Sequence, residues 1–130
     1  MPRFAVPLAL AALAVAVPLA AAQQQDARLD HALKGLTAGT PQKCIKRHSV
    51  NGTLTYDATL LFEGGRRFYY RNDVQGSCSG LAHGDTAVIT TTHGDEYCAG
   101  DTVRTHAPTG GAFSGACLLG DFVPYSAARN

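Results

Sequence analysis

Apolar residues follow three successive patterns along this 130-residue chain. The first is continuous: residues 4–19 carry no charge, follow a single Arg3, and lead into three alanines that end at Ala22. A positive start, an apolar stretch and small residues at its end are typical of a secretory signal peptide. We therefore expect residues 1–22 to be removed and the protein to be exported, either to the periplasm or out of the cell.

An uncleaved membrane anchor is the alternative for this stretch. A transmembrane helix needs about 20 apolar residues, and this segment is shorter and contains two prolines. No later segment is apolar enough to span a membrane. The sequence therefore predicts a mature chain without a transmembrane segment.

The second pattern has a helical period. Between residues 23 and 39, Leu29, Ala32, Leu33 and Leu36 recur at i, i+3, i+4 and i+7, which places them on one helix face. We expect a short N-terminal helix over 23–39, docked on the rest of the protein because so short a helix is marginal alone.

The third pattern begins at Cys44, where short runs rich in β-branched and aromatic residues alternate with glycine-containing turns. The clearest is a predicted hairpin in which residues 58–63 and 66–71 flank a Gly-Gly loop. In that register Leu61 faces Phe68, and both faces of the hairpin carry apolar side chains.

The remaining strands are expected at residues 46–50, 53–56, 86–92, 102–106 and 112–119. Pro124 is expected to end the ordered structure, since proline cannot donate to a sheet, and residues 126–130 to form a frayed tail. The sequence thus predicts a mostly β fold: one small antiparallel sandwich or barrel over residues 40–125, with one short N-terminal helix and two disulfides.

The cysteines sharpen this picture. An even number of cysteines in a short exported chain indicates a disulfide framework, and here there are four: Cys44, Cys78, Cys98 and Cys117. No C-x-x-C spacing supports a zinc site, and we expect no metal or cofactor. Of the three possible pairings, we favour Cys44–Cys78 with Cys98–Cys117 and keep Cys44–Cys117 with Cys78–Cys98 as the alternative.

The cysteines also stand in recognisable contexts. In order these are Cys44-Ile45, an aromatic strand ending in Arg71-Asn72, Cys78-Ser79-Gly80-Leu81, Cys98 with Asp101 three residues later, and Cys117-Leu118-Leu119-Gly120 followed by Phe122 and Pro124. This series resembles a family of small exported proteins of Gram-negative bacteria whose function is unknown. The resemblance spans residues 44–124 and implies an exported bacterial protein, but it brings no activity, ligand or catalytic residue.

The charge balance excludes one class of partner. The chain has 11 Lys plus Arg and 10 Asp plus Glu, and removal of Arg3 leaves it neutral. A chain without net positive charge lacks the basic surface by which proteins bind nucleic acids and anionic membranes. We therefore expect no nucleic-acid partner.

Two motifs have the outline of a catalytic or metal site. Residues 76–80 read G-x-C-x-G, but the nucleophile elbow needs a large α/β sheet that this chain is too short to form. His-Gly-Asp occurs at 83–85 and 93–95, but an extended segment between these motifs would separate Asp85 from His93 by about 26 Å. Both are better explained as turns.

The best candidate binding surface lies on the second hairpin strand. Arg67, Tyr69 and Arg71 alternate, so on a strand they point the same way. Arginine and tyrosine are enriched at binding hot spots, and arginine pairs bidentately with anionic groups. The alternative is that these side chains only cover the N-terminal helix.

These observations favour a non-catalytic exported binding or interaction module, because no nucleophile, base and orienting group come together in the sequence. Its partner would be an envelope protein, a polymer or a small ligand, and inhibition of a secreted hydrolase is a special case. The alternative is a small secreted hydrolase or metal-dependent enzyme that uses His83, His93, Asp95 or Asp101.

Overall fold

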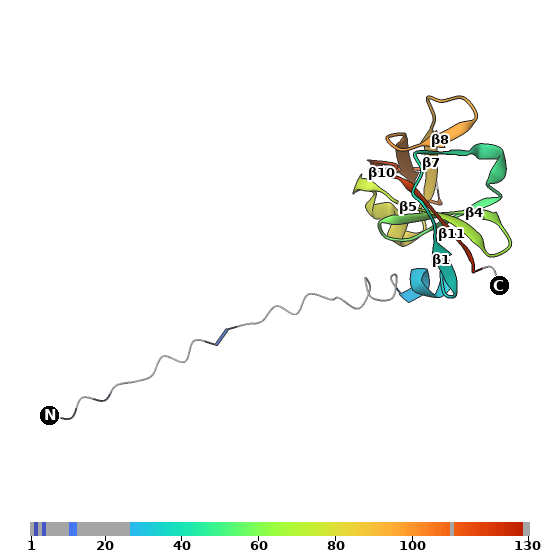
Figure 1. The fold of residues 1–130 in the computed structure, drawn as a ribbon. Helices are drawn as coiled ribbons and strands as arrows, with labels where there is room; N and C mark the ends of the chain where they lie inside the picture. Colours follow the sequence, from blue (N-terminus) through green and yellow to red (C-terminus); the bar gives the residue numbers. More distant parts are fainter. Residues whose placement is uncertain (1, 3, 5–10, 13–26, 110, 129–130) are drawn as a thin grey trace.

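The computed structural model describes residues 2, 4, 11–12, 27–109 and 111–128. The predicted signal peptide falls almost wholly outside these residues, as does the end of the predicted tail at 129–130. Within the described part, the chain forms eleven strands in three antiparallel sheets, together with one helix and two 3-10 turns (Figure 1). The mostly β fold predicted from the sequence is confirmed.

The largest sheet has five strands in the order β1-β11-β5-β4-β3. Its strands are β1 (Leu36–Ala38), β3 (Gly52–Thr55), β4 (Thr59–Gly65), β5 (Phe68–Asp73) and β11 (Phe122–Ala127). The first and last strands of the domain, β1 and β11, thus lie side by side (Figure 1).

The second sheet has four strands in the order β6-β10-β9-β7, and the third is a two-stranded ribbon, β2-β8. Their strands are β6 (Gln75–Ser77), β7 (Thr86–Thr90), β9 (Thr102–His106), β10 (Phe113–Leu118), β2 (Cys44–Lys46) and β8 (Glu96–Cys98). The 3-10 turns are η1 (Arg47–Ser49), which follows β2, and η2 (Ser79–His83), which precedes β7.

The main core joins the two larger sheets. Leu60 and Phe62 of β4 and Phe122 of β11 pack in one buried cluster with Val103 of β9 and Leu81 of η2. All five are at most 1% exposed. Burying each large apolar side chain contributes about 1.5–3 kcal/mol, so this cluster is the main hydrophobic contribution to stability.

The N-terminal helix ends earlier than predicted, and residues 23–26 of the predicted helix lie outside the described residues. In the described residues it covers 27–32, and the segment Leu36–Ala38 is strand β1, not a last helical turn. Gly35, in the left-handed region at φ 78°, ends the helical stretch, as glycine commonly does. The predicted apolar stripe is nevertheless buried: Leu29 and Leu33 pack in a second cluster with Leu61 of β4.

The β4–β5 hairpin forms, but not in the predicted register. Leu61 pairs with Arg71, not with Phe68. Gly65 instead pairs with Phe68, so the loop consists of the two arginines that follow Gly65, and a bulge lies just before it. Arg67 adopts a positive φ of 54° in this loop. The observed register turns alternate residues of β4 toward the two clusters, so both faces are buried, as the sequence predicts.

Order also extends further toward the C-terminus than predicted. Pro124 lies inside β11, opposite Tyr70 of β5. Its carbonyl accepts the Gly39 N–H at 2.7 Å, and the proline nitrogen faces the same side of the strand. Because β1 has already ended at Ala38 on that side, the missing N–H of proline costs little sheet hydrogen bonding. The predicted frayed tail is wrong at Ser126 and Ala127, because both pair with β1.

Two disulfides form, but in the pairing that the sequence analysis did not favour: Cys44–Cys98 and Cys78–Cys117. Neither proposed pairing is correct. Cys44 and Cys98 are direct cross-strand partners in the β2–β8 ribbon, a pairing that only the sheet topology determines. The second disulfide joins the residue before η2 to β10.

Candidate functional site

The structure separates the three residues of the predicted binding surface. Arg67 lies in the exposed hairpin loop. Its guanidinium lies beside Gly35 at the end of the helix, so close that a side chain at Gly35 would come within 3.1 Å of Arg67 Nη2. Tyr69 is half-buried in the cluster formed with Leu29 and Leu61, so it covers the helix. Arg71 lines an open cleft.

The cleft beside Arg71 has a volume of about 330 Å³. It lies where β5 ends, β6 begins and the chain enters β11. Its lining residues are Pro41, Lys43, Arg71, Asp73, Gln75, Gly120, Asp121 and Val123.

Two ion pairs flank this cleft. Lys43 Nζ lies 2.7 Å from Asp121 Oδ1, and Arg71 Nε donates to Asp73 Oδ1 at 3.0 Å. Thr59 Oγ1 donates to the same Asp73 oxygen at 2.8 Å. The four charged groups sum to zero, so the cleft presents both donors and acceptors without a net charge.

Arg71 is held in place from two sides. Partial burial opposes its charge, but hydrogen bonding and charge interactions with Asp73 and Tyr125 raise the pKa of its guanidinium above the ordinary value. Asp73 uses only one of the five N–H donors of the Arg71 guanidinium, so the others remain for Tyr125 and for a ligand.

A buried amide fixes the loop that carries Asp121. Asn72 is fully buried, its Nδ2 donates to the Gly120 carbonyl at 2.8 Å, and its Oδ1 accepts the Gly120 N–H at 2.8 Å. A side chain at Gly120 would collide with the backbone of Asp73. The Arg-Asn and Leu-Gly motifs noted in the sequence therefore meet in space, and together they shape the cleft.

The two His-Gly-Asp motifs are structural turns, as predicted, at opposite ends of β7. Asp85 is buried and accepts a hydrogen bond from Ser114. Asp101, also buried, accepts the Cys98 N–H at 2.8 Å. Asp101 thus satisfies a backbone group of its own turn, whereas Asp85 binds a hydroxyl of strand β10.

The contacts of His93 do not form a catalytic triad. Thr92 Oγ1 lies 3.1 Å and Asp101 Oδ1 3.8 Å from the same ring nitrogen, Nδ1. A triad needs the hydroxyl and the carboxylate on opposite nitrogens, so that the ring can relay a proton.

Two groups of side chains in the described residues have metal-ligand spacing. One contains Cys44, Glu96 and Cys98, and the other contains His93, Cys98 and Asp101. Both depend on Cys98, whose sulfur is bonded to Cys44, and a metal requires the thiolate. With the disulfide formed, neither group keeps three ligands.

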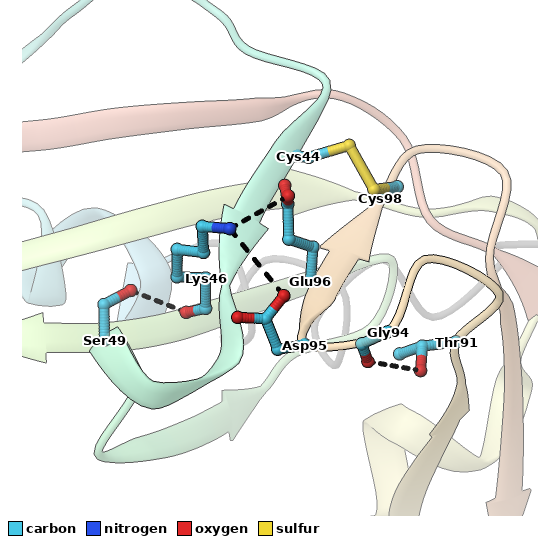
Figure 2. Close-up of polar contacts among 8 residues, drawn as sticks. All are labelled: Cys44, Lys46, Ser49, Thr91, Gly94, Asp95, Glu96 and Cys98. Carbon is cyan, nitrogen blue, oxygen red and sulfur yellow. Dashed lines mark hydrogen bonds and ion pairs between the residues drawn. A yellow bond between two sulfur atoms is a disulfide. The ribbon is translucent and has the colours of Figure 1, made fainter.

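A third ion-pair group lies on the β2–β8 ribbon, beside the Cys44–Cys98 disulfide. Figure 2 shows Lys46 reaching toward both Asp95 and Glu96; its Nζ lies 3.1 Å from Glu96 Oε1 and 3.7 Å from Asp95 Oδ1. Its hydrogen bond to Glu96 and the nearby negative charges raise the pKa of Lys46. In this group Lys46 and Asp95 are exposed and Glu96 is half-buried, and none of the three lines the Arg71 cleft.

Comparison with known proteins assigns no family. No protein-family model matches the chain, and no match was found among curated proteins or solved structures. The resemblance to the exported bacterial family therefore stays a prediction. In the part of the chain that the structure describes, no helix is long and apolar enough to cross a membrane.

The sequence analysis identified Arg71 but missed the rest of the cleft. Lys43 and Asp121 are 78 residues apart and carry no local signal that they pair. Asn72 belongs to the Arg-Asn motif noted in the sequence, but its charged neighbours Arg71 and Asp73 gave no sign that it is buried.

Proposed function

We propose that this protein is a non-catalytic exported module that binds an envelope protein at the Arg71 cleft. The observation that carries this proposal is a polar cleft whose charged walls are held by the buried Asn72–Gly120 contact. Fixed polar groups lose little conformational freedom on binding, which favours recognition.

The contacts of the cysteines and of Ser114 in the described residues favour binding over catalysis. Both disulfides are formed and leave no free cysteine there. Ser114 is hydrogen-bonded to a carboxylate and to Thr105, without a histidine as base. These contacts do not favour the hydrolase alternative.

Export is part of the proposal. Disulfides persist mainly in oxidising compartments, and this chain has two. The predicted signal peptide and the resemblance to an exported family point to the same compartment.

The chemistry of the cleft indicates the kind of partner. Paired cations and anions match a polypeptide segment that offers both carbonyl and amide or charged groups, and they do not select a polyanion. Exposed ion pairs around a fixed centre also resemble the polar rim of a protein interface.

The test exchanges the charges of one ion pair without removing it. The double variant Lys43→Glu with Asp121→Lys keeps net charge and pairing but reverses the field at the cleft. The matched control is Lys46→Glu with Glu96→Lys, a Lys–carboxylate ion pair on the β2–β8 ribbon, outside the cleft. Immobilised wild-type protein and both variants are incubated with envelope extract of the source organism, and bound proteins are identified by mass spectrometry.

We expect the cleft exchange to reduce capture of the specific partner at least about tenfold, because like charges then face each other across the interface. The ribbon exchange should leave capture unchanged. Equal capture by all three proteins, or an equal loss in both variants, would refute the cleft as the binding site. Capture of carbohydrate alone would replace the protein partner by a polymer.

A further inference from the structure

Strand β7 is an open edge of the four-stranded sheet. In the described part of the chain it pairs with β9 alone, and its other edge has no backbone partner. An edge strand exposes unpaired N–H and C=O groups that can pair with a further strand. Any such addition extends the sheet.

Natural edge strands are usually protected by charge, proline, bulges or shortness. The other three edges of the two larger sheets are shorter: β1 and β6 have three residues each, and β3 has four. β7 has five residues, with the sequence Thr-Ala-Val-Ile-Thr, and contains no charge, proline or glycine. Its pairing with β9 runs through all five residues without a register shift.

Three exposed side chains of this sheet are large and apolar, among exposed polar ones such as Thr86, Thr90 and Arg104. Val88 at the centre of β7 is 49% exposed. On β10, Phe113 and Leu118 are 62% and 43% exposed. Of the large apolar side chains in the folded domain that are exposed, all but Leu54 are on this sheet.

We propose that β7 pairs antiparallel with β7 of a second copy, which joins the two four-stranded sheets into one eight-stranded sheet. The sequence of the strand is self-complementary about Val88. With Val88 on the twofold axis, Thr86 lies opposite Thr90 of the other copy and Ala87 lies opposite Ile89. No charged residue of either strand meets a like charge, and the threonines form the favourable cross-strand pairs of antiparallel sheets.

A second copy fits this edge better than an unrelated strand does. The strand carries no charge that would select a partner, whereas its own sequence satisfies every pair of the symmetric register. Such a contact is small, below about 1,200 Å² in total, so we expect a dissociation constant of about 10–100 μM. This interface does not involve the Arg71 cleft, so it stands or falls independently of the proposed function.

The test measures association of the oxidised full chain, produced in a host that exports it, by sedimentation equilibrium from about 1 μM to 1 mM. The variant Val88→Lys places two lysines together on the symmetry axis and should weaken the dimer at least about tenfold. The matched control is Leu118→Lys, which adds the same charge on the same sheet at similar exposure, but on a strand that already has two neighbours. It should leave the dissociation constant within about twofold.

A second pair of variants tests the register. Thr86→Lys with Thr90→Glu places opposite charges across the symmetric pair and should preserve the dimer. Thr86→Lys with Thr90→Lys places like charges there and should dissociate it. Circular dichroism and thermal melting verify that each variant is folded.

Several results would overturn the proposal. If the protein is monomeric at every concentration, β7 does not pair with a second copy, and the edge would then be free for a strand of a different protein. An equal loss from Val88→Lys and Leu118→Lys would indicate face-to-face association through the apolar side chains. Equal behaviour of the two charge-pair variants would exclude the symmetric register.

Discussion

Replacing Asn72 by alanine should destabilise the protein far more than its size suggests. The side chain is fully buried and makes two hydrogen bonds, each of 2.8 Å, to the N–H and C=O of Gly120. Alanine would leave both backbone groups buried without partners, at about 1–3 kcal/mol each, so the expected loss is about 2–6 kcal/mol. A single domain of this size has only about 5–15 kcal/mol of stability, so the loss is a large fraction.

The assay is urea unfolding of the oxidised protein, followed by circular dichroism. We expect the midpoint to fall with little change in the slope, because the surface exposed on unfolding stays the same. The control is Asn51→Ala, which removes an exposed amide from the turn before β3 and should change stability by less than about 0.5 kcal/mol. If Asn72→Ala costs less than about 1 kcal/mol, the Asn72–Gly120 contact does not hold the loop and the reasoning is wrong.

Three further predictions follow from the disulfides, the buried tyrosine and the N-terminal pattern. Replacing Cys78 and Cys117 by serine opens a loop with a sequence separation of 39 and should cost about 4 kcal/mol in a urea titration; a loss below 1 kcal/mol would contradict this. Burial raises the pKa of Tyr56 above its ordinary value of 10.0. The neutral phenol therefore stabilises the folded protein fully below about pH 10, and this stabilisation is lost as the pH rises through the folded-state pKa. Tyr56→Phe should reduce this alkaline loss of unfolding free energy, and an unchanged dependence of stability on pH would argue against it. Intact-mass measurement of the exported protein should find Gln23 as the first residue, and a mass that retains residues 1–22 would mean an anchored chain.

Patterns of period and turn chemistry predicted about half of the elements. They did not predict β1, β6, β8 and β11 as strands, and the strand expected at 46–50 is mostly the turn η1. The alternation of residues 102–106 and the run at 112–119 gave β9 and β10 within one or two residues. The stripe of leucines in the helix is buried as expected. These features depend on neighbours in sequence, and period alone therefore identifies them.

What the sequence could not supply depends on distant partners. The Gly-Gly signal predicted the hairpin loop two residues too early: both glycines belong to β4, and the two residues after them form the loop. Pro124 is tolerated within β11 because β1 happens to end beside it. The cysteine pairing follows from the alignment of β2 with β8, which nothing in the spacing of the cysteines indicates.

The candidate site shows the same limit. Alternation correctly placed Tyr69 and Arg71 on one face of β5, but the loop removed Arg67 from that face. Lys43, Asp121 and the Gly120 loop reach Arg71 only through the pairing of β5 with β11. The cleft is built from three chain segments, and none of these segments alone has a sequence pattern that predicts it.

Photo-cross-linking in living cells tests the binding role of the cleft most directly. A photoreactive residue replaces Gln75, which lines the cleft without joining either ion pair. The control position is Asn51, an exposed amide at the opposite end of β4 from the strand end beside the cleft. We expect a discrete cross-linked protein from position 75 and none from position 51. No adduct at position 75, or the same adducts at both positions, would contradict a partner bound at the Arg71 cleft.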